Sequence, residues 1–282
     1  MSNHFKTALL LSLMTLMIIL FGMLLGGNQG LKIASALALG FNFLTWWFSA
    51  DLVLTQTRAR ILKPGEAPEL VALVSYLAKR ANLPQPRVAI VNDPTPNAFA
   101  TGRNSIQAVV AVTTGLLSLM NQEELAGVLG HELTHIKNRD ILIGSMAAVM
   151  AGTIMLLANL AKFNFIYLSH RPHNDKHNNP IAALLIAFLT PLAALLIQTA
   201  ISRSREYLAD DGGASIVGTP TGLASALNKL GHYQDHPQTV SPATAHIFIV
   251  NPLNRRSLSN LFATHPPLKE RIARLNSQIL CP

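Results

Sequence analysis

The chain has 282 residues, of which 50% are hydrophobic and 13% are charged, and its mean hydropathy is +0.33. It is too apolar for one ordinary soluble domain and long enough for one domain plus membrane segments. The net charge of +8 does not indicate a nucleic-acid partner, because the 22 Lys and Arg residues are scattered and form no basic face interleaved with aromatic residues. The single cysteine, Cys281, excludes an intrachain disulfide and a cysteine-based metal cluster.

Four apolar segments are long enough to cross a bilayer, and they run from Thr7 to Leu25, Ile33 to Leu54, Ile141 to Ala161 and Ile181 to Ile201. They predict an N-terminal transmembrane hairpin (1–54), a first polar block (55–140), a second hydrophobic hairpin (141–201) and a second polar block (202–282). The first segment is longer than the core of a secretory signal, and no small-residue cleavage site follows it, which favours a retained hairpin. For the third and fourth segments, buried core helices of a soluble domain remain an alternative.

The distribution of positive charge predicts how these segments are oriented. Lysine and arginine flank most segment ends, whereas the Gly-rich turn between the first two segments has only Lys32 nearby. This bias predicts that both termini and both polar blocks face the cytoplasm, where the blocks can form one domain. Trp46 and Trp47 fit either an aromatic belt at a bilayer interface or an ordinary core.

The first polar block contains a pattern of short elements. A helix is predicted around Glu69 to Ala81, a short strand at Arg87 to Val91 and a second apolar run at Ala108 to Val112. A small sheet beside helices is therefore expected in this block.

Residues 130–135 read Gly-His-Glu-Leu-Thr-His and follow an apolar spacing typical of a buried amphipathic helix. His131 and His135 then lie one turn apart on one helix face, where two imidazoles can bind a single zinc ion. Glu132 is placed to accept a proton from the attacking water. Two histidines that only cap or pack a helix are the alternative, and a third ligand is needed to decide.

Glu206 supplies a plausible third ligand at the point where the chain leaves the fourth apolar segment. Its carboxylate would complete a His-His-Glu site with one open position. Asp210 follows one helical turn later, where it can accept a hydrogen bond from a ligand histidine and fix its tautomer. The alternative is a solvated helix in which these acids pair with neighbouring arginines.

Several ordered motifs carry a family resemblance across essentially the whole chain. These are the two apolar hairpins and residues 97–102 (NAFATG), 130–135 (GHELTH), 204–210 (SREYLAD) and 264–272 (THPPLKERI). In this set the chain resembles the HtpX-type membrane zinc endopeptidases, which are relatives of the CAAX prenyl proteases. The resemblance implies one Zn²⁺ per chain, with the metal, base and supporting roles on the residues already chosen.

The resemblance also implies a fold and a setting. The fold is a mainly α membrane protein with a gluzincin-like α+β metalloprotease domain and about four hydrophobic helices in two hairpins. The catalytic domain would face the cytoplasm at the bacterial inner membrane. The activity would be linked to removing misfolded or damaged membrane proteins, often under stress.

Two further elements have possible roles in the site. The segment at Asn97, Ala98 and Phe99 follows a Pro-rich loop and could offer backbone donors and acceptors to an extended substrate, although an ordinary turn fits it too. His265 precedes two prolines and could reach the developing oxyanion, although packing explains it equally well. His170, His173 and His177 lie between the third and fourth segments and are interpreted as loop residues.

Two other functions are compatible with the same motifs. A membrane scaffold or transporter could use His131, His135 and Glu206 for structural zinc or as a transport site, and a zinc hydrolase could act on a lipid-linked substrate. Structural zinc usually has no open position, so three ligands beside Glu132 favour catalysis. The expected partners are unfolded or membrane protein substrates and the lipid bilayer.

Overall fold

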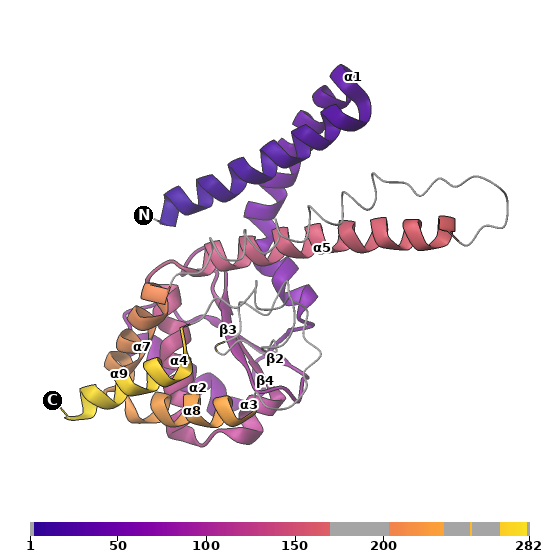
Figure 1. Ribbon diagram of the computed structural model, residues 1–282. Coiled ribbons are helices and arrows are strands. Elements are labelled where there is room, and N and C mark those ends of the chain that lie inside the picture. The colour runs from indigo at the N-terminus through magenta and orange to yellow at the C-terminus, as the bar shows by residue number, and fades with distance from the viewer. Residues whose placement is uncertain (1–2, 170–202, 234–248, 250–265, 281–282) are drawn as a thin grey trace.

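The computed structural model describes residues 3–169, 203–233, 249 and 266–280 (Figure 1). The predicted fourth apolar segment (181–201), His170, His173, His177 and His265 lie outside the described residues. The described helices are α1 (Asn3–Gln56), α2 (Pro68–Arg80), α3 (Thr114–Leu119), α4 (Gln122–Lys137), α5 (Ile141–Ser169), α7 (Arg203–Val217), α8 (Thr221–Tyr233) and α9 (Leu268–Leu280). The strands are β1 (Arg60–Ile61), β2 (Arg87–Val91), β3 (Ala98–Thr101) and β4 (Val109–Thr113).

Helix α1 is a hairpin of two helical arms that project from the rest of the chain (Figure 1). The chain reverses at Gly27, whose φ of 53° lies in the left-handed region that glycine adopts without strain. Asn42 donates a hydrogen bond of 2.6 Å to the hydroxyl of Thr15 across the two arms. Residues 3–56 therefore form a helical hairpin, and the prediction that it is a transmembrane hairpin stays a prediction.

The second arm, Gly27–Gln56, has the length and apolar composition needed to cross a membrane, and within the described residues it alone does. Many of its large apolar side chains are exposed: Ile33, Leu37, Leu39, Phe43, Leu44, Trp46, Trp47, Phe48 and Leu52. In water, an exposed apolar surface of this size would promote aggregation, whereas a bilayer would cover it. The prediction of four spanning helices in two hairpins goes beyond this one span and stays a prediction.

The sheet has the strand order β1-β2-β4-β3, with β2 and β4 parallel and both outer pairs antiparallel. Strand β2 has the predicted bounds, and β4 is displaced by one residue from the predicted run. Alternate residues of β2 and β4 enter two different cores, as the two-residue period of a strand requires. Helices α2, α4 and α8 pack against one face of the sheet and form a core with it. The end of α1 and the start of α5 pack against the other face of the sheet.

The third predicted apolar segment begins inside the protein. Helix α5 starts at Ile141, and its side chains at Met146, Ala147, Met150 and Ile154 are buried. They pack in the region where α5 meets α1 and β3. Protein therefore surrounds the first turns of this segment, and both a spanning helix and a core helix remain compatible with that burial.

Candidate active site

Helix α4 carries the His-Glu-x-x-His sequence and is well defined at its start. Asn121 accepts a hydrogen bond from the backbone N–H of Glu124, and the Glu124 carboxylate accepts one from the backbone N–H of Asn121. This capping box satisfies two donors at the helix start. The Glu124 carboxylate also pairs with Lys229 of α8 at 2.7 Å, which ties α4 to the C-terminal block.

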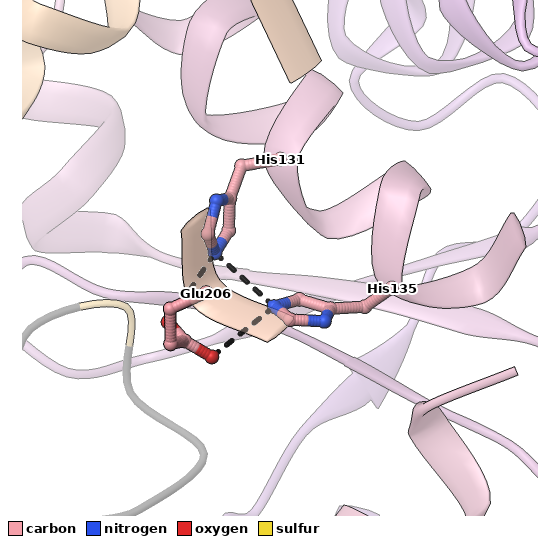
Figure 2. Close-up of side chains that lie close together, drawn as sticks. All are labelled: His131, His135 and Glu206. Atoms are coloured by element: carbon pink, nitrogen blue, oxygen red, sulfur yellow. Dashed lines mark hydrogen bonds and ion pairs between the residues drawn. The ribbon is translucent and has the colours of Figure 1, made fainter. Parts of the chain in front are cut away.

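Glu206 reaches the two histidines from α7, which packs closely against α4. A Cβ added at Gly213 would lie 2.7 Å from the backbone nitrogen of His131, so only glycine permits this approach. Figure 2 shows the three side chains pointing toward one another. The two Nε2 atoms are 3.2 Å apart, and the Glu206 carboxylate oxygens lie 3.8 Å from His131 Nε2 and 3.6 Å from His135 Nε2.

Behind His131 lies a buried carboxylate held by a buried arginine. Asp210 lies 2.9 Å from His131 Nδ1, and Arg271 of α9 donates to Asp210 through Nε at 2.8 Å and Nη2 at 2.6 Å. The same guanidinium donates to the carbonyl of Ile249 at 2.9 Å. Burial alone would raise the pKa of Asp210, but the hydrogen bonds and charge of Arg271 outweigh it and lower that pKa.

His135 has a matching arrangement on its far side. Its Nδ1 lies 3.3 Å from Asp140, and Asp140 in turn lies 3.5 Å from the guanidinium of Arg205. Burial would lower the pKa of His135, but Asp140, Glu206 and Glu132 outweigh it and raise the pKa to about 9. Burial lowers the pKa of His131, against the opposing effect of Asp210. Both histidines thus turn Nδ1 to a carboxylate and Nε2 to the common centre.

Glu132 has the environment of a tuned base. Its side chain is buried, and burial together with the negative charge of Glu206 raises its pKa to about 7, against the opposing effect of His135. It also accepts a hydrogen bond from the backbone N–H of Ala100 in β3. A general base works best when its pKa lies near the working pH.

The predicted substrate-binding residues lie on the edge strand β3 or immediately before it. Asn97, Ala98 and Phe99 are buried as whole residues, backbone included, whereas Ala100 is partly exposed. The backbone N–H of Thr113 donates to the carbonyl of Asn97, and backbone groups alternate in direction along a strand. Ala98 and Ala100 therefore turn their backbone groups away from β4, toward the edge at which no further strand pairs with β3 among the described residues, beside Glu132.

Two residues with evident roles were missed from the sequence. Asp140 follows the end of α4, immediately before the third apolar segment, and its position five residues after His135 is a usable signal. Arg271 lies in the 264–272 motif, in which only His265 was singled out. Nothing in the local sequence marks Arg271 as buried, because α9 is amphipathic and rich in charge.

The donor set fits zinc. One ligand atom from each of His131, His135 and Glu206 lies within 4.8 Å of the others. At bond lengths of about 2.0–2.1 Å in a tetrahedral site, two ligand atoms lie about 3.3–3.5 Å apart. The observed separations of 3.2 to 3.8 Å are close to this value. Both histidines also have the carboxylate partners that commonly fix ligand imidazoles.

The site combines an HExxH helix, a glutamate from a second helix and an edge strand beside them. This combination is typical of a metallopeptidase, and in this chain an apolar helical hairpin precedes it. The chain belongs to peptidase family M48, whose family model matches residues 64–279. It is 53% identical over 277 residues to a "Protease HtpX homolog" of Desulfatibacillum aliphaticivorans, covering 98% of this chain and 89% of that one. A protein of the same name from Thermococcus kodakarensis is 52% identical over 272 residues, covering 96% and 94%.

Among solved structures, the chain is similar to the crystal structure of S. mikatae Ste24p, with 18% identity and a TM-score of 0.48. That similarity covers 93% of this chain and 61% of Ste24p. Family membership confirms the resemblance drawn from the motifs and identifies a membrane-associated metalloendopeptidase. It favours the protease over the scaffold, the transporter and the lipid hydrolase.

Proposed function

We propose that this chain is a zinc-dependent endopeptidase in which His131, His135 and Glu206 bind one zinc ion and Glu132 is the general base. The observation that carries the proposal is the convergence of both Nε2 atoms and the Glu206 carboxylate beside a buried carboxylate whose pKa is raised to about 7. When bound, zinc would supply a Lewis acid that polarises the scissile carbonyl and acidifies water.

The residues of the chain divide the remaining work among them. Glu132 takes a proton from the attacking water and later passes it to the leaving amine. Asp210 and Asp140 hold the two imidazoles with Nε2 toward the metal position, and each carboxylate has an arginine beside it. His265 is proposed to assist the oxyanion.

The substrate is proposed to be an extended peptide that adds to the edge of β3. The backbone of Ala100, which faces away from β4 and is partly exposed, supports this, since strand addition uses backbone hydrogen bonds and tolerates many sequences. Such tolerance suits the unfolded or damaged membrane proteins that we propose as substrates, and hence a role in protein quality control.

The proposed setting is a multi-pass arrangement in the bacterial inner membrane, with residues 1–54 and 141–201 as two hairpins. The two polar blocks, 55–140 and 202–282, would form the catalytic domain on the cytoplasmic side. The bias of lysine and arginine toward the segment ends supports this orientation.

The decisive experiment compares the detergent-purified wild type with Glu132→Gln for cleavage of casein, with bound metal measured in both. Glutamine keeps the shape of the side chain but cannot take the proton, so cleavage should fall by roughly 10²–10⁴-fold. Zinc content should stay near one per chain, because the three ligands are unchanged. Equal cleavage by both proteins would remove Glu132 from its role, and a wild type without stoichiometric zinc would reject the proposed metal site.

A further inference from the structure

A cationic side chain from the catalytic domain meets the only two tryptophans of the chain, Trp46 and Trp47. The guanidinium carbon of Arg103 lies 3.9 Å from the ring centroid of Trp47 and 6.0 Å from that of Trp46. Phe43 stacks on Trp47 at 5.8 Å. We refer to Trp46, Trp47 and Arg103 as the Arg103–Trp cluster.

The cluster lies where α1 passes from the protein into its exposed apolar stretch. Val53 and Leu54 are buried against the sheet. The two tryptophans precede them by six to eight residues, which is about 9–12 Å along a helix. On the other side of the tryptophans, the large apolar side chains of α1 are exposed as far as Ile33. Tryptophan is enriched at this type of boundary, at the level of lipid headgroups.

Arg103 itself lacks an anionic partner in the part of the chain that the structure describes, where no ion pair joins it to a carboxylate. A guanidinium stacked on an indole keeps its N–H groups available at its edge, and their fork matches phosphate oxygens. Ile106, three residues later in the same loop, is 76% exposed, so the loop presents an exposed apolar side chain as well as the cation. An apolar tip beside a cation suits a membrane surface.

We propose that the Arg103–Trp cluster binds the phosphate of an anionic phospholipid and seats the loop at residues 102–107 on the bilayer surface. Strand β3 connects this loop to the active site, because Ala100 donates to Glu132 and lies only three residues from Arg103. Three extended residues span about 10 Å. If the loop lies on the bilayer surface, the active site lies close to that surface, and the peptide bonds that reach it are those of the substrate just outside the bilayer. This consequence rests on the proposed peptidase function.

The lipid site can be tested without proteolysis, because both tryptophans belong to the cluster and all indole fluorescence reports on it. The full chain carrying Glu132→Gln is reconstituted in mixed vesicles of phosphatidylcholine and phosphatidylglycerol. The brominated, quenching chains are placed on one lipid or on the other at equal mole fraction. We expect brominated phosphatidylglycerol to quench severalfold more strongly than brominated phosphatidylcholine.

Arg103→Gln should remove this preference and leave quenching by phosphatidylcholine unchanged. Arg87→Gln is the matched control, since Arg87 is an exposed arginine on β2 of the same domain and should retain the preference. Arg103→Lys keeps the charge but loses the planar fork, so it should retain only part of the preference and serves if Arg103→Gln does not fold.

Three results would overturn the proposal. Equal quenching by both lipids would mean that the indoles meet lipid without a headgroup site, and an absence of quenching would place them in the protein interior. The third result is competition by added salt. If inorganic phosphate, but not chloride at equal ionic strength, removes the preference for phosphatidylglycerol, the site binds free phosphate and not a lipid. None of these outcomes depends on whether the chain cleaves casein.

Discussion

Replacing Arg271 with methionine tests how strongly the metal site depends on a buried ion pair. Arg271 is fully buried, and its two hydrogen bonds to Asp210 at 2.6 and 2.8 Å hold the carboxylate that faces His131. Methionine has a similar length without the charge. The substitution therefore leaves the Asp210 carboxylate buried beside His131 without its cation.

The expected cost is large because only one partner is removed. Breaking a buried pair in this way costs about 3–5 kcal/mol. For a chain of this size, about 1 kcal/mol shifts the melting temperature by roughly 2–4 °C, so a fall of roughly 6–20 °C is expected. Zinc affinity should fall as well, by about 10–100-fold, because the orientation of His131 loses its support.

Thermal unfolding and zinc titration of detergent-purified protein measure both effects. The matched control is Arg274→Met, which removes an exposed arginine of the same helix that pairs with Asp211 at 3.4 Å. An exposed pair of this kind contributes roughly 0–1 kcal/mol, so the control should melt within about 4 °C of the wild type. The double variant Asp210→Leu with Arg271→Met should recover stability but not zinc affinity, because no buried charge is left unpaired.

The pH dependence has a definite sign. In the wild type the pKa of Asp210 lies below its usual value of 3.8, so the stability from this pair is present above about pH 4 and is lost as the pH falls further. Without Arg271 the pKa of Asp210 rises, and protonation then relieves the unpaired charge. The destabilisation by Arg271→Met should therefore be largest near pH 7 and shrink toward pH 4. A melting temperature and zinc affinity equal to the wild type at pH 7 would refute the assigned role of Arg271.

Three other changes test the site from different sides. Asp140→Asn should weaken zinc binding by about 10–100-fold, because His135 loses its carboxylate partner. Asp211→Asn, on the outer side of α7, is the control and should bind zinc like the wild type. Equal zinc affinities of the two variants would contradict the role of Asp140. Gly213→Ala forces a Cβ against the backbone of α4 and should cost about 1–3 kcal/mol in thermal unfolding together with loss of bound zinc. Gly144→Ala, where a Cβ meets nothing within 4 Å, is its control, and indistinguishable variants would exclude tight packing as the reason for glycine. The pKa of His135 is raised to about 9, and zinc binds only the neutral imidazole, so zinc must displace a proton below pH 9. Zinc affinity in metal-buffered titrations should therefore rise about tenfold per pH unit between pH 7 and 9. An affinity that does not change with pH would show that no proton is displaced.

The sequence predicted the elements whose signals are local. The spacing within residues 130–135 predicts one helix face, and that helix is α4. The buried run at Arg87 to Val91 matches β2 because a strand inside a sheet has a recognisable β-branched pattern. Strand β3 is only four residues long, and its identity as an edge strand depends on pairing with β4. That pairing is not encoded within the segment.

The parts of the site that the sequence did not predict depend on tertiary packing. Arg271 lies on an amphipathic helix among charged neighbours, and the packing of α9 against α7 and α8 buries it. Asp140 was hidden by its place at the start of an apolar segment, where a charge has an obvious topological explanation. Local patterns therefore identify the groups that touch the metal more readily than the groups that hold them.

The positions of these supporting residues have a consequence for how the site forms. Both histidines come from α4 in the first polar block, but Glu206, Asp210, Arg205 and Arg271 all come from beyond the second apolar segment pair. The carboxylate behind His135 belongs to the turn at which the third apolar segment begins. Because Glu206 and the carboxylate behind His131 lie on the other side of residues 141–201 from the two histidines, the proposed zinc site cannot be complete until the chain beyond residue 201 has packed against α4. Metal binding is thus linked to the arrangement of the apolar segments, and proteolytic competence should follow, rather than precede, their assembly.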